Sequence, residues 1–337
     1  MVGAGVWYAQ FQAPAGQENT DVGFDLQSGV NGSSFSGFGF FGNYDERIDG
    51  PGKVWNLTNV SNITINNVWV EHEVVAVWGA SLVKNSTFEN MRIRDTFADG
   101  INLTNGSTGN LITNDEARST GDDSFVLFAA EDQASAPLEN NTISNVTSLL
   151  SWRAAGVAIY GGDTNTAKNF YVADTLAYPG LTVSSLNFGY PFQGFGPGQT
   201  TITNFSLARD GGHFWGGQVF GAIWMFSATN TFTGLRISNG TITNPTYSGI
   251  MFQTDYVGGT AQATFQDTTF TNMTVTGAQQ SGDQFNSNSG YGIFGNPLPE
   301  AGQGPAVGAV TFTGLTESNN FINIYNPSSA TFTITVN

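Results

Sequence analysis

RDTFADGINLTNGSTGNLITNDEARSTGDDSFVLF, residues 94–128, carries two acidic turn motifs. The first is Ala98-Asp99-Gly100-Ile101 and the second is Asp122-Asp123-Ser124-Phe125. Asp99 and Asp123 are 24 residues apart (123 − 99). If the chain coils with turns of that length, these aspartates take the same place on neighbouring turns, about 4.8 Å apart. The stretch therefore predicts a cluster of three carboxyl groups, from Asp99, Asp122 and Asp123.

Three carboxyl groups at close range have a chemical consequence. They cannot all ionise freely, so at least one pKa should rise and the cluster can hold an acid and a base together. Such a combination is what a glycosidase uses. The competing interpretation is that Asp-Gly and Gly-Asp-Asp-Ser only form turns, in which aspartate side chains accept hydrogen bonds from nearby N–H groups. That interpretation weakens when three aspartates fall in register.

A small residue followed by an apolar one recurs along the chain. The pairs are Ala76-Val77, Gly100-Ile101, Ser124-Phe125, Gly156-Val157, Gly180-Leu181, Gly249-Ile250 and Gly292-Ile293. The first intervals are 24, 24, 32 and 24 residues. This register predicts an all-β right-handed parallel β-helix, a single domain over residues 1–337, with the apolar member of each pair inside. About three short strands are expected in each turn. A β-sandwich would show turn signals about every 8–12 residues without the longer register.

Two segments rich in proline and glycine, residues 192–198 and 296–304, are expected to form loops on the rim of a substrate cleft. They could equally be simple connections. A solenoid that starts abruptly at Met1 also leaves an open end, and terminal turns need caps. We therefore expect the leader, the first coils and any accessory modules to be missing from this chain.

Composition limits the partners. The formal net charge is −16, from 10 Lys and Arg against 26 Asp and Glu, so nucleic acid, anionic lipid and anionic polysaccharide are poor ligands. A neutral polysaccharide suits the chain better. Cysteine is absent, which excludes disulfides and thiolate chemistry. No apolar run reaches the roughly 18 residues of a membrane span, and MVGAGVWYAQF is not a signal peptide. We expect a secreted, extracellular monomer whose leader is not present here.

Residues that follow the inward ones should face outward beside the aspartates. Asn102 follows Ile101, and Trp78 falls in the same column on the preceding turn. Tyr160 lies in the next turn but one along the sheet. Trp78, Asn102 and Tyr160 are therefore candidate substrate contacts, because aromatic rings can stack on the apolar faces of sugars. Simple packing of the two aromatic rings is the alternative.

The sequence gives little indication of a metal site or of a serine nucleophile. His72 and His213 are the two histidines, too few and too far apart to indicate a metal site. No Gly-x-Ser-x-Gly elbow occurs. Asp and Asn turns could hold a structural calcium, although the calcium-binding nonapeptide repeat is absent. We expect no required cofactor, and any calcium to be catalytically silent.

Several motifs in order together resemble the catalytic module of glycoside hydrolase family 87, the bacterial α-1,3-glucanases (mutanases) and mycodextranases. They are GAGVWY at 3–8, FGNYDERID at 41–49, VWVEHEVVAVW at 68–78, RIRDTFADGIN at 92–102, STGDDSFVLF at 119–128, GVAIYGG at 156–162 and FGAIWMFS at 220–227. TFADGIN followed by TGDD at this interval is the most specific part. His72 and Trp224, which lie in two of these pieces, join the candidate substrate contacts.

The resemblance implies a β-helix and inverting endo-hydrolysis by Asp99, Asp122 and Asp123. In related β-helix glycosidases the residue at the position of Asp122 protonates the leaving oxygen, while those at Asp99 and Asp123 activate the water. Inversion implies roughly 6.5–9.5 Å between the acid and the base, with room for that water. Cleavage of α-1,3-linked or mixed α-1,3/1,4-linked glucan, with an acidic optimum, is the activity expected.

Other classes remain open from the residues. A dextranase-like hydrolase or a polygalacturonase would share the fold, but the Gly-His-Gly and Arg-x-Lys motifs of the latter are absent. A non-catalytic β-helix that binds glycans would release no reducing sugar. A polysaccharide lyase would need a Lys or Arg base beside calcium ligands, and the central turns offer little beyond Arg92, Arg94 and Arg118.

Overall fold

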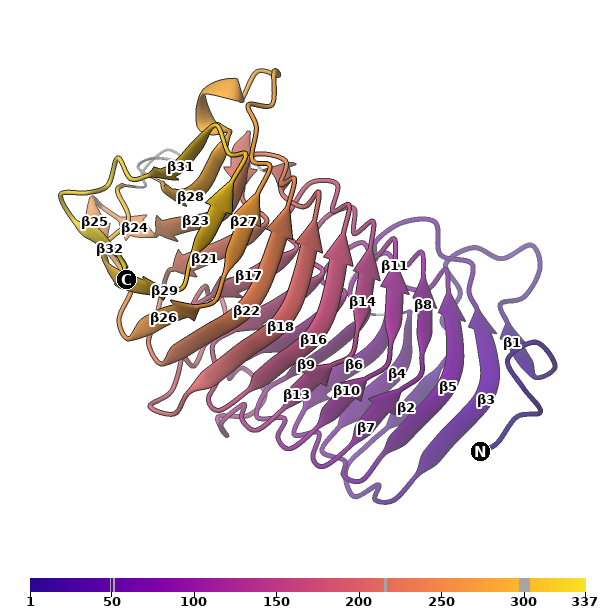
Figure 1. Cartoon of the computed structure of the whole chain (residues 1–337). Helices are drawn as coiled ribbons and strands as arrows, with labels where there is room; N and C mark the ends of the chain where they lie inside the picture. The colour runs from indigo at the N-terminus through magenta and orange to yellow at the C-terminus, as the bar shows by residue number, and fades with distance from the viewer. Residues whose placement is uncertain (49, 51, 215–216, 297–303) are drawn as a thin grey trace.

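The chain is coiled into a solenoid whose turns stack from one terminus to the other (Figure 1). The structure is a computed structural model and describes residues 1–48, 50, 52–214, 217–296 and 304–337. Strands on two sides of the coil pair in parallel with those of the preceding and following turns. The strands of each turn therefore form their backbone hydrogen bonds with strands of the turns before and after it. This arrangement confirms the predicted parallel β-helix.

The larger sheet forms the front face in Figure 1. In the described part of the chain its strands are β1 (Gln10–Gln12), β3 (Ser34–Phe41), β5 (Thr64–Glu71), β7 (Thr87–Glu89), β8 (Arg92–Arg94), β10 (Leu111–Thr113), β11 (Glu116–Arg118), β13 (Thr142–Ser144), β14 (Thr147–Leu149), β16 (Thr166–Ala173), β18 (Thr200–Ala208), β22 (Leu235–Thr243), β26 (Thr268–Thr271), β27 (Thr274–Thr276), β29 (Gly308–Thr313), β30 (Thr316–Ser318) and β32 (Phe332–Val336).

The smaller sheet lies behind it and carries the predicted aspartate motifs. Its described strands are β2 (Phe24–Leu26), β4 (Lys53–Thr58), β6 (Val75–Ser81), β9 (Ile101–Thr104), β12 (Phe125–Phe128), β15 (Val157–Tyr160), β17 (Leu181–Ser184), β21 (Ile223–Ser227), β23 (Ser248–Thr254), β28 (Tyr291–Gly295) and β31 (Ile322–Tyr325). Antiparallel hairpins β19 (Gly212–Phe214) with β20 (Gln218–Phe220) and β24 (Tyr256–Val257) with β25 (Thr260–Ala261) project from the coil, as does the 3₁₀ turn η1 (Asn286–Asn288).

The register of the smaller sheet follows the predicted repeat. Its paired inward residues are, in order, Val77, Ile101, Phe125, Val157, Leu181, Ile223, Ile250 and Ile293. All but Ile223 belong to the pairs identified in the sequence. The turn that contains Ile223 was not identified from the sequence, because a long loop and the β19–β20 hairpin precede it and interrupt the regular spacing of the pairs. All eight side chains have 0% exposure, so they form the core that holds the turns together.

The number of strands in a turn differs along the coil. Central turns have three, such as β10, β11 and β12, whereas β5, β16, β18 and β22 pass unbroken through the same bend. At this bend, successive turns carry an asparagine with a positive φ angle. These residues are Asn67, Asn90, Asn114, Asn145, Asn169, Asn204, Asn239 and Asn272. Asparagine tolerates this left-handed conformation better than most residues. Its amides also bond along the stack, as from Asn169 to Asn145 at 3.2 Å.

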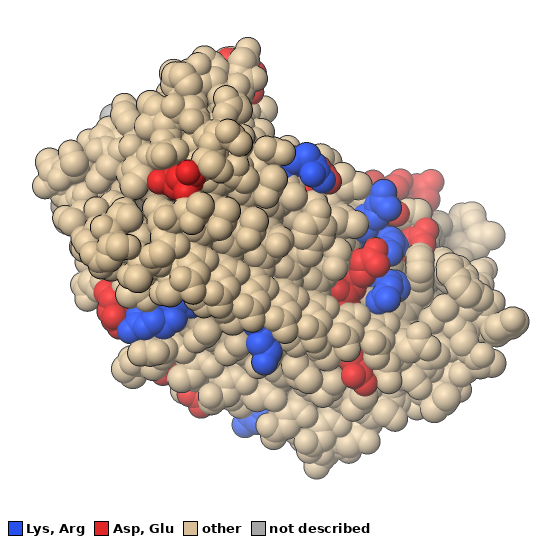
Figure 2. Space-filling model, in the orientation of Figure 1, with Lys and Arg blue, Asp and Glu red and all other residues tan. Residues whose placement is uncertain are grey.

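Charged side chains are sparse on the face shown in Figure 2, and several positive ones lie beside negative ones. Arg209 pairs with Asp174 at 2.5 Å and Arg236 with Asp267 at 2.8 Å. Exposed pairs of this kind contribute little stability. Within the residues that the structure describes, no helix is both long and apolar enough to cross a bilayer.

Candidate active site

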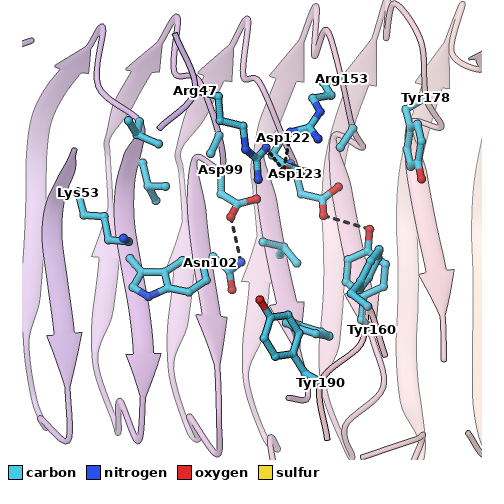
Figure 3. Close-up of a pocket in the computed structure, with 18 of the residues that line it drawn as sticks. Arg47, Lys53, Asp99, Asn102, Asp122, Asp123, Arg153, Tyr160, Tyr178 and Tyr190 are labelled. Carbon is cyan, nitrogen blue, oxygen red and sulfur yellow. Dashed lines mark hydrogen bonds and ion pairs between the residues drawn. The ribbon is translucent and has the colours of Figure 1, made fainter. Parts of the chain in front are cut away.

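Asp99, Asp122 and Asp123 lie on neighbouring turns, just before β9 and β12 (Figure 3). The N–H of Gly100 donates to the backbone oxygen of Asp123 at 3.0 Å, which fixes the two turns side by side. A Cβ on Gly100 would lie 2.3 Å from the backbone oxygen of Ser124, so the motif needs glycine there. One carboxylate oxygen from each aspartate lies within 4.8 Å of the others. The repeat thus brings together the three residues that the sequence singled out.

Hydrogen bonds hold two of these carboxyl groups in place. Asp99 Oδ2 accepts from Asn102 Nδ2 at 3.0 Å. Asp123 accepts from the N–H of Ala155 at 2.8 Å through Oδ1, and from the hydroxyl of Tyr160 at 3.0 Å through Oδ2. Because both oxygens of Asp123 already accept hydrogen bonds, its orientation is fixed before substrate arrives.

Two arginines surround the third carboxyl group. Arg47 donates to Asp122 Oδ2, and Arg153 Nη1 lies 3.7 Å from the same oxygen. Arg47 comes from the loop between β3 and β4, and Arg153 from the connection between β14 and β15. The guanidinium groups balance the negative charge of Asp122, which is the most exposed of the three aspartates.

Burial decides where protons reside in the cluster. It raises the pKa of Asp99 to about 7, the charge of Asp122 adds to the increase, and the Asn102 bond and Arg47 oppose it. Burial also raises the pKa of Asp123 well above its usual value, with further contributions from Asp122 and Asp99. At neutral pH the cluster therefore keeps at least one proton, and it titrates as a unit.

The three aspartates line a cavity of about 470 Å³. Its floor is the outer face of the smaller sheet, including Trp78, Asn102 and Tyr160. The walls come from the connections between strands and from the end of β19. Figure 3 shows Arg47 and Arg153 at one edge of the cavity and Tyr190 at the opposite edge, and Tyr178, Phe188 and Phe214 also line it. The volume is in the range of small-ligand sites, and the mixture of aromatic rings and hydrogen-bonding groups suits a saccharide.

Two expected substrate contacts are corrected by the geometry. His72 lies on the turn after β5, outside the cavity, where its Nε2 is 3.8 Å from Asp95 Oδ2. Trp224 does lie in the outward column, but it is buried and donates its indole N–H to Gln253 at 2.9 Å. Phe220, from the β19–β20 hairpin, packs on Trp224 at 4.9 Å between ring centroids. The hairpin thus covers the position, and Trp224 supports the cavity wall through Tyr178.

Sequence reasoning missed the residues that loops deliver. Arg47 lies in the FGNYDERID piece and could have been found as a basic residue within a matching motif. Arg153, Phe188 and Tyr190 have no such signal, because nothing in the repeat says where a loop will fold.

The expected rim loops have different outcomes. Within residues 192–198, Phe192 packs its ring on Phe128 at 5.8 Å between centroids, and it is Phe188 and Tyr190 just before this segment that line the cavity. Most of residues 296–304 lie outside the described part of the chain.

Side chains that could bind a cation occur in two groups of the described residues: Glu71, His72 and Asp95, and the three active-site aspartates. The second group fits calcium poorly, because Asp122 Oδ2 already interacts with the positively charged side chains of Arg47 and Arg153.

The profile of the alpha-1,3-glucanase catalytic domain D2 family matches residues 1–337. The chain belongs to this family. The match confirms the resemblance to glycoside hydrolase family 87 inferred from the motifs. A comparison with curated proteins gave no match.

Solved structures agree with this alpha-1,3-glucanase family assignment. One catalytic domain of a family 87 alpha-1,3-glucanase in complex with tetrasaccharides is 41% identical, with a TM-score of 0.92 over 99% of this chain and 59% of that one. Another, in complex with nigerose, is 40% identical with a TM-score of 0.89 and the same coverage. The catalytic unit from Streptomyces thermodiastaticus strain HF3-3, at 24% identity and a TM-score of 0.73, shares the fold. The chain thus spans 59% of the length of the first two.

The solved family 87 domains include variants in which one of three aspartates is alanine. Two of those aspartates are adjacent, and the third precedes the first of them by 23 positions. Asp99, Asp122 and Asp123 have the same spacing (122 − 99 = 23).

Proposed function

We propose that this chain is the catalytic domain of an extracellular enzyme that hydrolyses α-1,3-glucosidic linkages within glucan chains, in mutan or in mixed α-1,3/1,4-glucan. The observation that carries the proposal is the cluster of Asp99, Asp122 and Asp123 on the floor of an open, aromatic-lined cavity. Related domains support the proposal: the alpha-1,3-glucanase catalytic domains that are 41% and 40% identical to this chain form complexes with tetrasaccharides and with nigerose.

In the proposed mechanism Asp122 protonates the leaving oxygen while Asp99 and Asp123 orient and deprotonate the attacking water. Asp122 is the most exposed of the three and lies beside Arg47 and Arg153. Asp99 and Asp123 hold protons more readily than free carboxyl groups do, because burial raises the pKa of both. The mechanism therefore requires the shared proton to move to Asp122 when glucan fills the cavity and excludes water.

We further propose inversion of the anomeric carbon. The nearest oxygens of the cluster lie within 4.8 Å, which is closer than the roughly 6.5–9.5 Å usual between acid and base in inverting enzymes. Retention would require one carboxylate to attack carbon. Asp123 is poorly suited to that role because both its oxygens accept hydrogen bonds, from Ala155 and Tyr160. These bonds suit a group that orients water.

The proposal has three further parts: the substrate is a neutral glucan, the reaction requires no cofactor, and the protein is a secreted monomer. The formal net charge of −16 disfavours an anionic polysaccharide as the substrate. Any calcium would be structural. Hydrolysis should therefore continue at an unchanged rate after treatment with a chelator; loss of activity that calcium restores would contradict this part.

The decisive experiment is release of reducing sugar from a panel of α-glucans, with α-1,3-glucan first. Asp99→Asn, Asp122→Asn and Asp123→Asn should each lower kcat by about 10³-fold or more while circular dichroism shows an intact fold. Proton NMR of the first products should show the anomer opposite to the substrate linkage. Full activity in all three variants would overturn the hydrolase assignment, and a non-catalytic glycan-binding protein would bind the polymers without releasing sugar.

A further inference from the structure

A second, polar hollow of about 240 Å³ adjoins the catalytic cavity towards the N-terminal turns. Gly50 and Lys53 line both spaces, so the two lie side by side. The lining that belongs to the second hollow alone includes Asp25, Asn56 and Phe24. None of these residues takes part in the chemistry described above.

The register places this hollow on the line along which a polymer would lie. Asp25 pairs with Asn56, Asn56 with Trp78, and Trp78 with Asn102, which holds the catalytic Asp99. These residues form one outward column parallel to the solenoid axis. At about 4.8 Å per turn, Asn56 is about 10 Å and Asp25 about 14 Å from Asn102. Lys53 Nζ lies 5.7 Å from the centre of the Trp78 ring, at the boundary between the two spaces.

The chemistry of the hollow suits sugar hydroxyls. Asn56 Nδ2 donates to Asp25 Oδ1 at 3.2 Å, and Asp25 is exposed to solvent. A carboxylate and an amide held together can accept from and donate to adjacent hydroxyl groups, and the half-buried ring of Phe24 offers an apolar surface.

We propose that this second hollow is a distal subsite that binds a glucosyl residue of the substrate, two to three turns towards the N-terminus from the catalytic aspartates. The inference rests on the proposed function. It makes the enzyme sensitive to chain length, because short oligosaccharides fill only the catalytic cavity and long ones also reach Asp25 and Asn56. Contacts with Asp25 and Asn56 then strengthen the binding of the longer substrates only.

The test uses a length series of α-1,3-linked gluco-oligosaccharides with the wild-type chain, Asp25→Ala and Asn56→Ala. Each variant should lose about tenfold in kcat/KM on the longest substrate, through KM, and nothing on the shortest one that is cleaved. Asn239→Ala, at an exposed bend of the opposite sheet, is the matched control and should leave every substrate unaffected. Equal losses at all lengths, or no loss at the longest, would overturn the subsite.

A binding measurement separates this proposal from the hydrolase assignment. Isothermal titration calorimetry of the longest oligosaccharide, in an Asp122→Asn background, should show weaker binding when Asp25→Ala is added. If the wild-type chain cleaves nothing yet Asp25→Ala still weakens binding of the long oligosaccharide selectively, the subsite stands and the hydrolase assignment falls. Unchanged affinity in the double variant overturns the subsite whatever the activity.

Discussion

Arg47 and Asp122 form an ion pair although they are 75 positions apart in the sequence. The loop between β3 and β4 carries the guanidinium across the mouth of the cavity to the turn before β12. Arg47 thereby balances the charge of the most exposed aspartate, and it also lowers the pKa of Asp99 against the larger effects of burial and of Asp122. Arg47 therefore holds Asp122 in place and also affects the protonation of Asp99.

The rate should fall as the pH rises through the neutral range. In the proposed mechanism the proton that Asp122 delivers is drawn from the aspartate cluster. The pKa of Asp99, raised to about 7 by burial and by Asp122, marks where the cluster begins to lose protons as the pH rises. We expect kcat/KM to decrease by about tenfold per pH unit on the alkaline side. A pH–rate profile on soluble α-1,3-gluco-oligosaccharides measures this. A flat profile from about pH 4 to 9 would contradict a shared catalytic proton.

Arg47→Gln should move that alkaline limb to higher pH. Removal of the positive charge raises the pKa of Asp99, since Arg47 lowers it in the wild-type chain. We also expect kcat to fall by about 10- to 100-fold because Asp122 loses its partner. Arg209→Gln removes a surface pair with Asp174, on the outside of the coil, and serves as the control. An unchanged limb with lowered kcat would mean that Arg47 acts on geometry alone.

Tyr160→Phe deletes one hydrogen bond and little volume. The Tyr160 hydroxyl donates to Asp123 Oδ2 at 3.0 Å and opposes the rise in the pKa of that carboxyl group. Its loss should leave Asp123 more often protonated and less able to orient water, which lowers kcat by about tenfold with little change in KM. Trp78→Ala, by contrast, should act on KM, because Trp78 lines the cavity without touching a carboxylate. A Tyr160→Phe variant that changes only KM would assign Tyr160 to sugar binding.

Glu73→Gln should remove a pH-dependent loss of stability. Glu73 is fully buried beside the cavity wall, neither of its carboxyl oxygens has a hydrogen-bond partner among the described residues, and burial, with Asp21, raises its pKa to about 9. The folded state therefore keeps a proton that the unfolded state releases near pH 4.5, so stability falls as pH rises from about 4.5 to 9.

Denaturant unfolding at several pH values measures this effect. Between pH 4.5 and 7 the free energy of unfolding of Glu73→Gln, relative to the wild-type chain, should increase by about 3 kcal/mol. Glu18→Gln, at an exposed position, is the control substitution. A constant difference across this range for Glu73→Gln would mean that Glu73 is ionised in the folded state.

Much of the fold could be predicted because the repeat length is written in the sequence. Once turns of 24 residues stack in register, residues such as Ile101 and Phe125 must be neighbours, and Asp99 and Asp123 follow. The same rule found Trp78, Asn102 and Tyr160 on the cavity floor. Trp224, chosen from a segment that carries the family resemblance, lies outside the cavity because the β19–β20 hairpin covers it, and a local pattern does not report what folds over a residue.

By itself the sequence determined the period of the coil, its core and the stack of aspartates, because hydrogen bonding between parallel strands locks each turn to the next. Only the tertiary structure decided which loop residues complete the site. Arg47, Arg153, Phe188 and Tyr190 come from connections that no repeat constrains, and their positions depend on packing against distant turns. The burial that raises the pKa of Asp99 and Asp123 is likewise a property of the assembled cavity, since a carboxyl group loses water only when its surroundings are in place.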